Sequence, residues 1–346
     1  MVKRSANLRL LRSLMKAGAA QQRAATKMVT GMLAAPKPRR AARQAAAPRV
    51  RTPAAAPVAP GRWLAGQHGP MSYWLYLPHA VPADAPDGLP LVLMLHGCQQ
   101  TATQFAQGTR MNAMAEKKGY AVLYPQQSVA VHAQRCWRWF DRATQLGGGD
   151  VQPVSAVLAT VLGQYPIDRR RIYVCGISAG AGMANIMALN FPDLFAAVGL
   201  HSGPVYGAGH GAVGALGVMR HGGGARTETA IREVLARRAA FPPLPTILIQ
   251  GEADTVVSAI NQQQLVRQSL LLNGVPSDAP VKVTRRGTRS GHEIRDYLVG
   301  RQVVLRVVRV DALAHAWSGG DPKIAFHAKG PDASRMMLEF FSKHRR

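Results

Sequence analysis

One short segment constrains the fold of this chain more than any other. Residues 171–180 read Arg-Ile-Tyr-Val-Cys-Gly-Ile-Ser-Ala-Gly, and an alanine- and methionine-rich stretch follows. A β-prone run that delivers a serine into Gly-x-Ser-x-Gly just before a helix is typical of a nucleophile elbow. The serine of such an elbow occupies a strained turn, so Gly176 and Gly180 are expected to leave room where that turn packs. Ser178 is therefore the predicted nucleophile.

A serine hydroxyl needs a histidine to accept its proton and a carboxylate to orient that histidine. Residues 245–251 are expected to form a short buried strand, with Asp254 on the loop that follows. Residues 303–310 are expected to form another strand, with His315 on its loop. We predict Asp254 as the acid and His315 as the base, in the chain order serine, acid, histidine. Three further histidines fall on expected loops: His201, His292 and His327.

The same chemistry requires two amides that stabilise an oxyanion. Residues 91–95 are continuously apolar, as in a strand that is buried on both faces, and His96-Gly97-Cys98 follows directly. The predicted donors are the backbone amides of Cys98 and Ala179, the residue after the nucleophile. His96 is expected to hold this turn rather than to act as a base.

Strands and helices alternate along the chain, which predicts an α/β fold with a doubly wound, mostly parallel sheet and helices on both faces. In this α/β-hydrolase arrangement the triad falls at the C-terminal ends of the strands. Asp150 is expected to cap the second helix. The expected strands are 72–77, 91–95, 121–124, 171–177, 196–200, 245–251 and 303–310, with a hairpin at 281–284 and 293–299, and the expected helices are 109–118, 151–164, 227–238, 262–272 and 334–341.

A glycine-rich stretch lies within residues 203–240, before and around the helix expected at 227–238. It has two interpretations. It is a flexible insertion, or it is a mobile lip over the site, since binding loops gather at this edge of such a sheet.

Charged residues are unevenly distributed along the chain. Residues 1–61 hold 13 of the 43 Lys and Arg residues and no Asp or Glu. The pattern predicts a basic amphipathic segment over 1–35, an Ala/Pro/Arg-rich linker over 36–61 and a catalytic domain over 62–346. Attachment of the first segment to a membrane or polyester granule surface is one interpretation, and a solubilising tail is the other. Specific nucleic-acid binding is disfavoured because no aromatic interleaving accompanies the charge.

From about Tyr73 onward the chain resembles the poly(3-hydroxybutyrate) depolymerase family of esterases, which are α/β-hydrolases related to feruloyl and acetylxylan esterases. The cysteine after His-Gly and the Cys-Trp-x-Trp-Phe block are its most specific features. The matching blocks are residues 95–98, 108–112, 122–127, 135–140, 147–150, 176–180, 251–254 and 315–320.

This resemblance implies hydrolysis of short-side-chain hydroxyalkanoate polyesters or their oligomers. It makes Trp137 and Trp139 candidates for lining the substrate groove, with core packing as the alternative. Cys98 and Cys136 belong to loops that border the site in the family, so a disulfide between them is an option in an oxidising compartment. Cys175 is expected to be a small buried residue.

Three functional hypotheses remain open at this stage. The first is a Ser-His-Asp ester hydrolase acting on polyesters or oligomers, the second is a feruloyl or acetylxylan esterase, and the third is a surface-binding protein with a degenerate hydrolase body. No cofactor is required, and no His/Cys spacing suggests a metal site. Many family members are extracellular, whereas no apolar signal sequence is evident here, which leaves a cytoplasmic location as the alternative.

Overall fold

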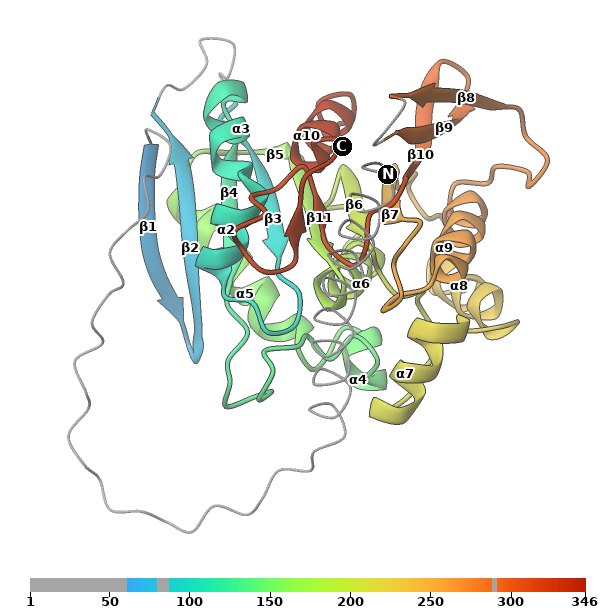
Figure 1. Ribbon diagram of the computed structural model, residues 1–346. Coiled ribbons are helices and arrows are strands. Elements are labelled where there is room, and N and C mark those ends of the chain that lie inside the picture. Colours follow the sequence, from blue (N-terminus) through green and yellow to red (C-terminus); the bar gives the residue numbers. More distant parts are fainter. Residues whose placement is uncertain (1–60, 80–86, 288–290) are drawn as a thin grey trace, which may run out of the picture. The chain divides into compact units, whose positions relative to one another are not determined.

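The computed structural model describes residues 61–79, 87–287 and 291–346. Its main feature is a ten-stranded sheet in the order β1-β2-β4-β3-β5-β6-β7-β10-β9-β8 (Figure 1). The basic segment predicted for 1–35 and nearly all of the linker predicted for 36–61 lie outside the described residues. The strands are β1 (Gly61–His68), β2 (Met71–Pro78), β3 (Leu89–Leu95), β4 (Ala121–Pro125), β5 (Ile167–Ile177), β6 (Ala197–His201), β7 (Thr246–Gly251), β8 (Val281–Arg286), β9 (His292–Val299) and β10 (Gln302–Val310).

The centre of the sheet, from β4 through β3, β5, β6 and β7 to β10, is parallel throughout. Antiparallel pairs extend it at both ends, with β1 and β2 beside β4, and β9 and β8 beside β10. Every residue of β3 is buried, as its unbroken apolar sequence predicts for a strand covered on both faces. The expected doubly wound, mostly parallel sheet is therefore confirmed.

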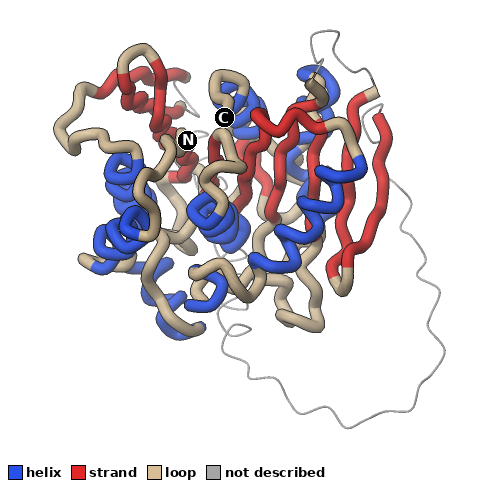
Figure 2. Tube along the Cα trace, turned by 180° about the vertical axis from the view of Figure 1, so that it is seen from behind, coloured by secondary structure: helices blue, strands red, loops and turns tan. Residues whose placement is uncertain are grey.

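Helices cover both faces of this sheet (Figures 1 and 2). One face carries α2 (Ala102–Thr109), α3 (Met111–Lys118) and α10 (Ala333–Phe341), and the other carries α5 (Val151–Gln164), α6 (Ala179–Asn190) and α9 (Ala259–Leu272). The short α4 (Arg142–Gln145) follows the loop after β4, while α7 (Ala212–His221) and α8 (Arg226–Ala236) lie between β6 and β7 in the chain. No helix in the described ranges is long and apolar enough to cross a membrane.

The helix α6 lies deepest in the molecule. Residues 179–189 are all buried, and they are mostly Ala, Gly and Met, which allow the helix to approach β3, β5 and β6 closely. On the opposite face α10 places Phe341 against Tyr173 of β5, with the rings stacked and their centroids 4.9 Å apart. Both faces of the strand that leads to Ser178 are thus packed.

Several elements differ from the sequence-based expectation. The edge strand β1 was missed, because its half-exposed residues show no regular alternation. The helix expected at 109–118 is present as α3, which begins at Met111, whereas α2 before it was missed; Arg110, with φ of 55°, separates the two helices. The glycine-rich stretch contains α7, despite Gly214 and Gly217 within it. The predicted hairpin is present as β8 and β9.

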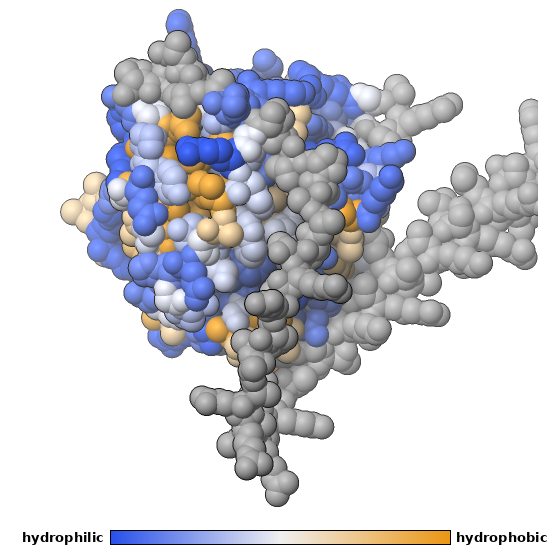
Figure 3. Space-filling model, turned by 90° about the vertical axis from the view of Figure 1, so that its left-hand side faces the viewer, coloured by the Kyte–Doolittle hydropathy of each residue, from blue (hydrophilic) through white to orange (hydrophobic). Residues whose placement is uncertain are grey.

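The β1 and β2 end of the sheet faces the viewer in Figure 3. Apolar side chains lie among polar ones on this surface. Trp63 of β1 is half-buried and packs on Tyr124 of β4, with ring centroids 5.6 Å apart. The missed strand therefore extends the core instead of adding a separate layer.

Candidate active site

Ser178 lies at the sharp turn between β5 and α6. Its backbone has φ of 56° and ψ of −125°, a conformation that costs free energy in any residue with a side chain and is typical of a functional turn. A Cβ added at Gly180 would lie 2.0 Å from the carbonyl oxygen of Leu95, and one at Gly176 would lie 2.5 Å from the same atom. The two glycines are thus required for close approach, as predicted.

Asp254 and His315 form a hydrogen-bonded pair. His315 Nδ1 lies 2.8 Å from Asp254 Oδ2, and both side chains are buried. Asp254 Oδ1 also accepts hydrogen bonds from the amides of Val256 and Val257, each at 2.9 Å. Burial raises the pKa of Asp254, but His315 and these amides outweigh it, so the pKa lies below the ordinary value. The carboxylate is therefore ionised at neutral pH.

The sheet explains why these residues lie at one edge. Asp254 follows β7 and His315 follows β10, and the two strands pair directly, with Gly251 opposite Val310. Ser178 follows β5, from which β7 is separated only by β6. Within the described part of the chain, Ser178 Oγ is buried and has no hydrogen-bond partner. The structure thus joins the predicted acid and base, whereas a bond from Ser178 to His315 stays a prediction.

The alternative histidines have other surroundings. His201, in β6, is buried, accepts a hydrogen bond from the amide of Ser318 (3.1 Å) and stacks on Trp317. His327 Nδ1 lies 2.9 Å from the carbonyl oxygen of Ala325. Among the four candidates, and counting only described residues, His315 alone has its ring bonded to a carboxylate.

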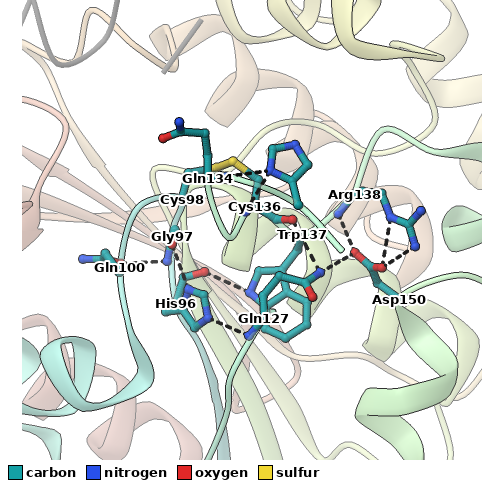
Figure 4. The surroundings of a disulfide bond; sticks show 11 residues. His96, Gly97, Cys98, Gln100, Gln127, Gln134, Cys136, Trp137, Arg138 and Asp150 are labelled. Carbon is teal, nitrogen blue, oxygen red and sulfur yellow. Dashed lines mark hydrogen bonds and ion pairs between the residues drawn. A yellow bond between two sulfur atoms is a disulfide. The ribbon is translucent and has the colours of Figure 1, made fainter. Parts of the chain in front are cut away.

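Hydrogen bonds and a disulfide fix the loop at residues 96–98, which carries the predicted oxyanion amide (Figure 4). His96 Nδ1 donates to the carbonyl of Gly97 (2.8 Å), and His96 Nε2 accepts from the amide of Gln127 (3.1 Å). Trp137 Nε1 donates to the carbonyl of His96 (3.0 Å). Cys98 itself is bonded to Cys136. His96 thus has the structural role expected for it, and the disulfide suggested by the family resemblance is present.

The two predicted oxyanion amides remain available. In the segments that the structure describes, no acceptor is bonded to the amide of Cys98. Ala179 begins α6, and the first amides of a helix have no partner within it. The N-terminus of α6 also carries partial positive charge, which stabilises an anion there.

Asp150 does not cap α5, contrary to the expectation. Its backbone is already helical and its side chain makes no capping bond. The carboxylate instead accepts from the amide and guanidinium of Arg138, at 2.7 Å for both the amide and Nη2, and from Gln127 Nε2 at 2.9 Å (Figure 4). A buried carboxylate takes charged and amide donors in preference to a partly exposed helix end. Asp150 therefore ties the beginning of the loop after β4, at Gln127, to Arg138 near the end of the same loop.

Trp137 and Trp139 are both buried, with 0% and 2% of their surfaces exposed. The indole N–H of the buried Trp137 is satisfied by its hydrogen bond to the carbonyl of His96. Trp139 packs against α6, where a Cβ added at Gly182 would lie 3.0 Å from it. Contact of either ring with substrate stays a prediction, and it requires neighbouring side chains to move.

Sequence reasoning missed two supports of the site, Gln127 and Gln250. Gln127 links His96 to Asp150, and Gln250 Nε2 donates to Asp254 Oδ2 at 3.0 Å. Each lies at or just after the C-terminal end of a buried strand. A polar residue at such a position is the sequence signal that could have identified both as supports of the site. No group of three or more His, Cys, Asp or Glu suited to a metal occurs in the described ranges.

Acid is expected to destabilise the fold through its buried histidines. Burial lowers the pKa of His96 to about 4 and that of His201 to about 3. Because the unfolded chain binds these protons near pH 6.5, stability is complete above that pH and falls as the pH drops toward 4, by roughly 2 kcal/mol for each histidine at pH 5. Urea midpoints at pH 7.5 and 5 measure this loss. His201→Gln should show a smaller loss, and equal midpoints for the parent would contradict the expectation.

Removing the disulfide is expected to lower both stability and activity. Cys98 and Cys136 are 38 residues apart, so the double Ser variant should lose roughly 2–4 kcal/mol of unfolding free energy. Activity should fall as well, because Cys98 carries a predicted oxyanion amide. Denaturant titration and initial rates measure both effects. Reductant should affect the parent and leave the double variant unchanged, and an equal response of the two proteins would contradict the prediction.

Comparison with known proteins identifies the family of the chain. The sequence model of the family described as "Esterase PHB depolymerase" matches residues 71–296. The chain belongs to this family. It is 30% identical over 224 residues to poly(3-hydroxyalkanoate) depolymerase C of Paucimonas lemoignei, covering 63% of this chain and 52% of that protein. It is 26% identical over 286 residues to a poly(3-hydroxybutyrate) depolymerase of Ralstonia pickettii, covering 77% and 57%.

The chain thus spans little more than half the length of these two family members. A probable acetylxylan esterase A of Aspergillus clavatus is 27% identical over 224 residues, covering 62% of this chain and 71% of that protein. Among solved structures, the acetyl xylan esterase of Aspergillus awamori superposes with a TM-score of 0.66 at 20% identity, covering 82% of this chain and 99% of that one. This likeness shows the α/β-hydrolase fold.

Proposed function

We propose that the protein is a serine ester hydrolase with Ser178 as nucleophile, His315 as base and Asp254 as acid. The observation that carries the proposal is the buried hydrogen bond of 2.8 Å between His315 and Asp254, on the loops beside a strained serine turn. Family membership supports it independently. In this role the carboxylate accepts a hydrogen bond from Nδ1–H, so His315 Nε2 has a free lone pair for the serine proton.

The reaction follows from these positions. Ser178 Oγ bonds to the ester carbonyl carbon while His315 Nε2 takes its proton, and the amides of Cys98 and Ala179 stabilise the oxyanion. His315 then gives the proton to the departing alkoxide oxygen as the ester C–O bond breaks. A water molecule, deprotonated by His315, hydrolyses the acyl-enzyme and restores Ser178.

For substrate, the polyesters and oligomers of short 3-hydroxyalkanoates are favoured. Two relatives carry depolymerase names, and alignment to the Ralstonia protein extends over 77% of this chain. Removal of acetyl groups from xylan is the second candidate, because proteins of that name share sequence and fold with the chain. A surface-binding protein with an inactive body is less favoured because the acid–base pair is intact.

Attachment to a granule or membrane through the basic segment is also part of the proposal. So is an extracellular location, with which the disulfide is consistent.

Two measurements test the proposal. A fluorophosphonate should label the native protein on Ser178, located by peptide mass spectrometry, and heat-unfolded protein should not react. Initial rates should then be compared for 3-hydroxybutyrate oligomers, acetylated xylan, feruloyl esters and p-nitrophenyl esters of graded length. Highest kcat/KM on the hydroxybutyrate oligomers supports the first substrate class, whereas preference for acetylated xylan would replace it. Absence of both labelling and turnover would overturn the enzymatic proposal.

A further inference from the structure

A cleft of about 710 Å³ lies between α4, the loop at 208–210, α7 and the beginning of α8. Among the described residues, its lining includes four side chains with basic nitrogens and no acidic side chain: Arg142, His210, His221 and Arg226. Several glycines complete the walls, so backbone is accessible and the cleft is wide. No step of the proposed reaction uses these residues.

Two walls of the cleft are connected to elements that carry the candidate active site. The segment that leads to Ala208 begins with Gly203 and Pro204, and these residues pack on the first turn of α6, next to Ser178. The other wall, α7, is bonded to the chain that follows Asp254, since the amide of Ser258 donates to the carbonyl of Met219 at 2.8 Å. Figure 1 shows α4 and α7 close together at the edge to which β3 points.

The positive charge in the cleft is incompletely neutralised. Arg142 is exposed and forms no ion pair within the described ranges. The adjacent Asp141 is engaged with the amide and hydroxyl of Thr144, both at 3.2 Å. Within the part of the chain that the structure describes, the one ion pair of Arg226 is a long contact of 3.8 Å with Glu233, in which both side chains are about half exposed. Guanidinium groups placed in this way are well suited to a carboxylate, which they bind in a bidentate manner.

We infer that this cleft binds the terminal carboxylate of a hydroxyacid oligomer whose ester bond lies at Ser178. The inference rests on the proposed ester hydrolysis and specifies its substrate further. A linear hydroxyacid polyester has one free carboxylate per chain, and each cleavage generates another. Arg142 and Arg226 therefore favour oligomers with a free acid end over neutral esters of the same length.

The experiment compares 3-hydroxybutyrate trimer acid with its methyl ester. In the double variant Arg142→Gln, Arg226→Gln, KM for the acid should rise roughly three- to tenfold, while KM for the methyl ester and both kcat values stay constant. Arg232→Gln is the matched control, because it removes an exposed charge from the same helix α8, outside the cleft. The preference of the parent for the acid should decline with added salt.

Equal changes for acid and ester, or an equal effect of Arg232→Gln, would overturn the inference. Direct binding separates it from the proposed reaction. Trimer acid should bind to Ser178→Ala in a calorimetric or NMR titration, and more weakly when both arginines are also replaced. If the parent hydrolyses neither compound but this binding is observed, the proposed hydrolysis fails and the carboxylate site stands. If Ser178→Ala shows no binding that depends on the arginines, the site is refuted.

Discussion

Replacing Ser178 with alanine is expected to lower kcat/KM on soluble esters by about four to six orders of magnitude, because triad members act as a unit. The fold should be unaffected. Ser178 Oγ is buried without a hydrogen-bond partner among the described residues, so its removal is expected to leave stability unchanged or to raise it by about 1 kcal/mol. Initial rates and a urea unfolding curve measure the two effects on the same preparation.

Ser155→Ala provides the matched control for this substitution. Ser155 lies on α5, and among the described residues its hydroxyl donates only to the carbonyl of Gln152, at 2.9 Å. It should retain parental activity. If Ser178→Ala, expressed in a host without competing esterases, kept a tenth or more of the parental rate, Ser178 could not be the nucleophile.

Gly180→Ala should have the second largest effect on activity. It acts by a steric clash and removes no catalytic group. The added methyl group would lie 2.0 Å from the carbonyl oxygen of Leu95 and 2.5 Å from that of His96, both of which are backbone atoms. The end of β3 and the elbow must therefore separate. We expect a loss of about 3 kcal/mol in unfolding free energy, as for severe overpacking. Activity should fall at least a hundredfold, since the amides of Cys98 and Ala179 no longer share one site.

The control for this variant is Gly163→Ala, in α5. No heavy atom of the described residues lies within 4 Å of a Cβ built there, and the backbone is helical. Alanine at that position should stabilise the protein by roughly 0.5–1 kcal/mol with unchanged activity. Thermal unfolding and initial rates check both variants. A Gly180→Ala protein as stable and active as the parent would show that the elbow and the end of β3 are not in close contact.

The sequence was most informative where chemistry and burial act together. Runs such as 91–95 are apolar on both faces, which identifies buried strands, and Asp254 and His315 follow two of those strands directly. The pairing of β7 with β10 then brings them within 2.8 Å. The two residues lie together because the C-terminal ends of parallel strands meet at one edge, and their roles as acid and base stay a proposal.

The sequence was least informative where tertiary contacts override the local preference for a secondary structure. Gly214 and Gly217 disfavour a helix, yet α7 forms because Asn261 of α9 donates to the carbonyls of Val218 and Met219 near its end. Asp150 has the sequence position of a helix cap, but Arg138 and Gln127 provide stronger partners. The partners in these hydrogen bonds are 12 to 43 residues apart in the sequence, so no local pattern could indicate them.

The connection between β6 and β7 has an evolutionary consequence. The two strands pair directly with each other, so the sheet does not depend on the length of residues 202–245, which carry α7 and α8. Insertions, deletions or exchange of this segment can change which molecules reach the site while the strand ends that carry the chemistry stay in register. Sequence changes that alter ester preference should therefore concentrate in residues 202–245. Directed-evolution libraries are best confined to the same segment.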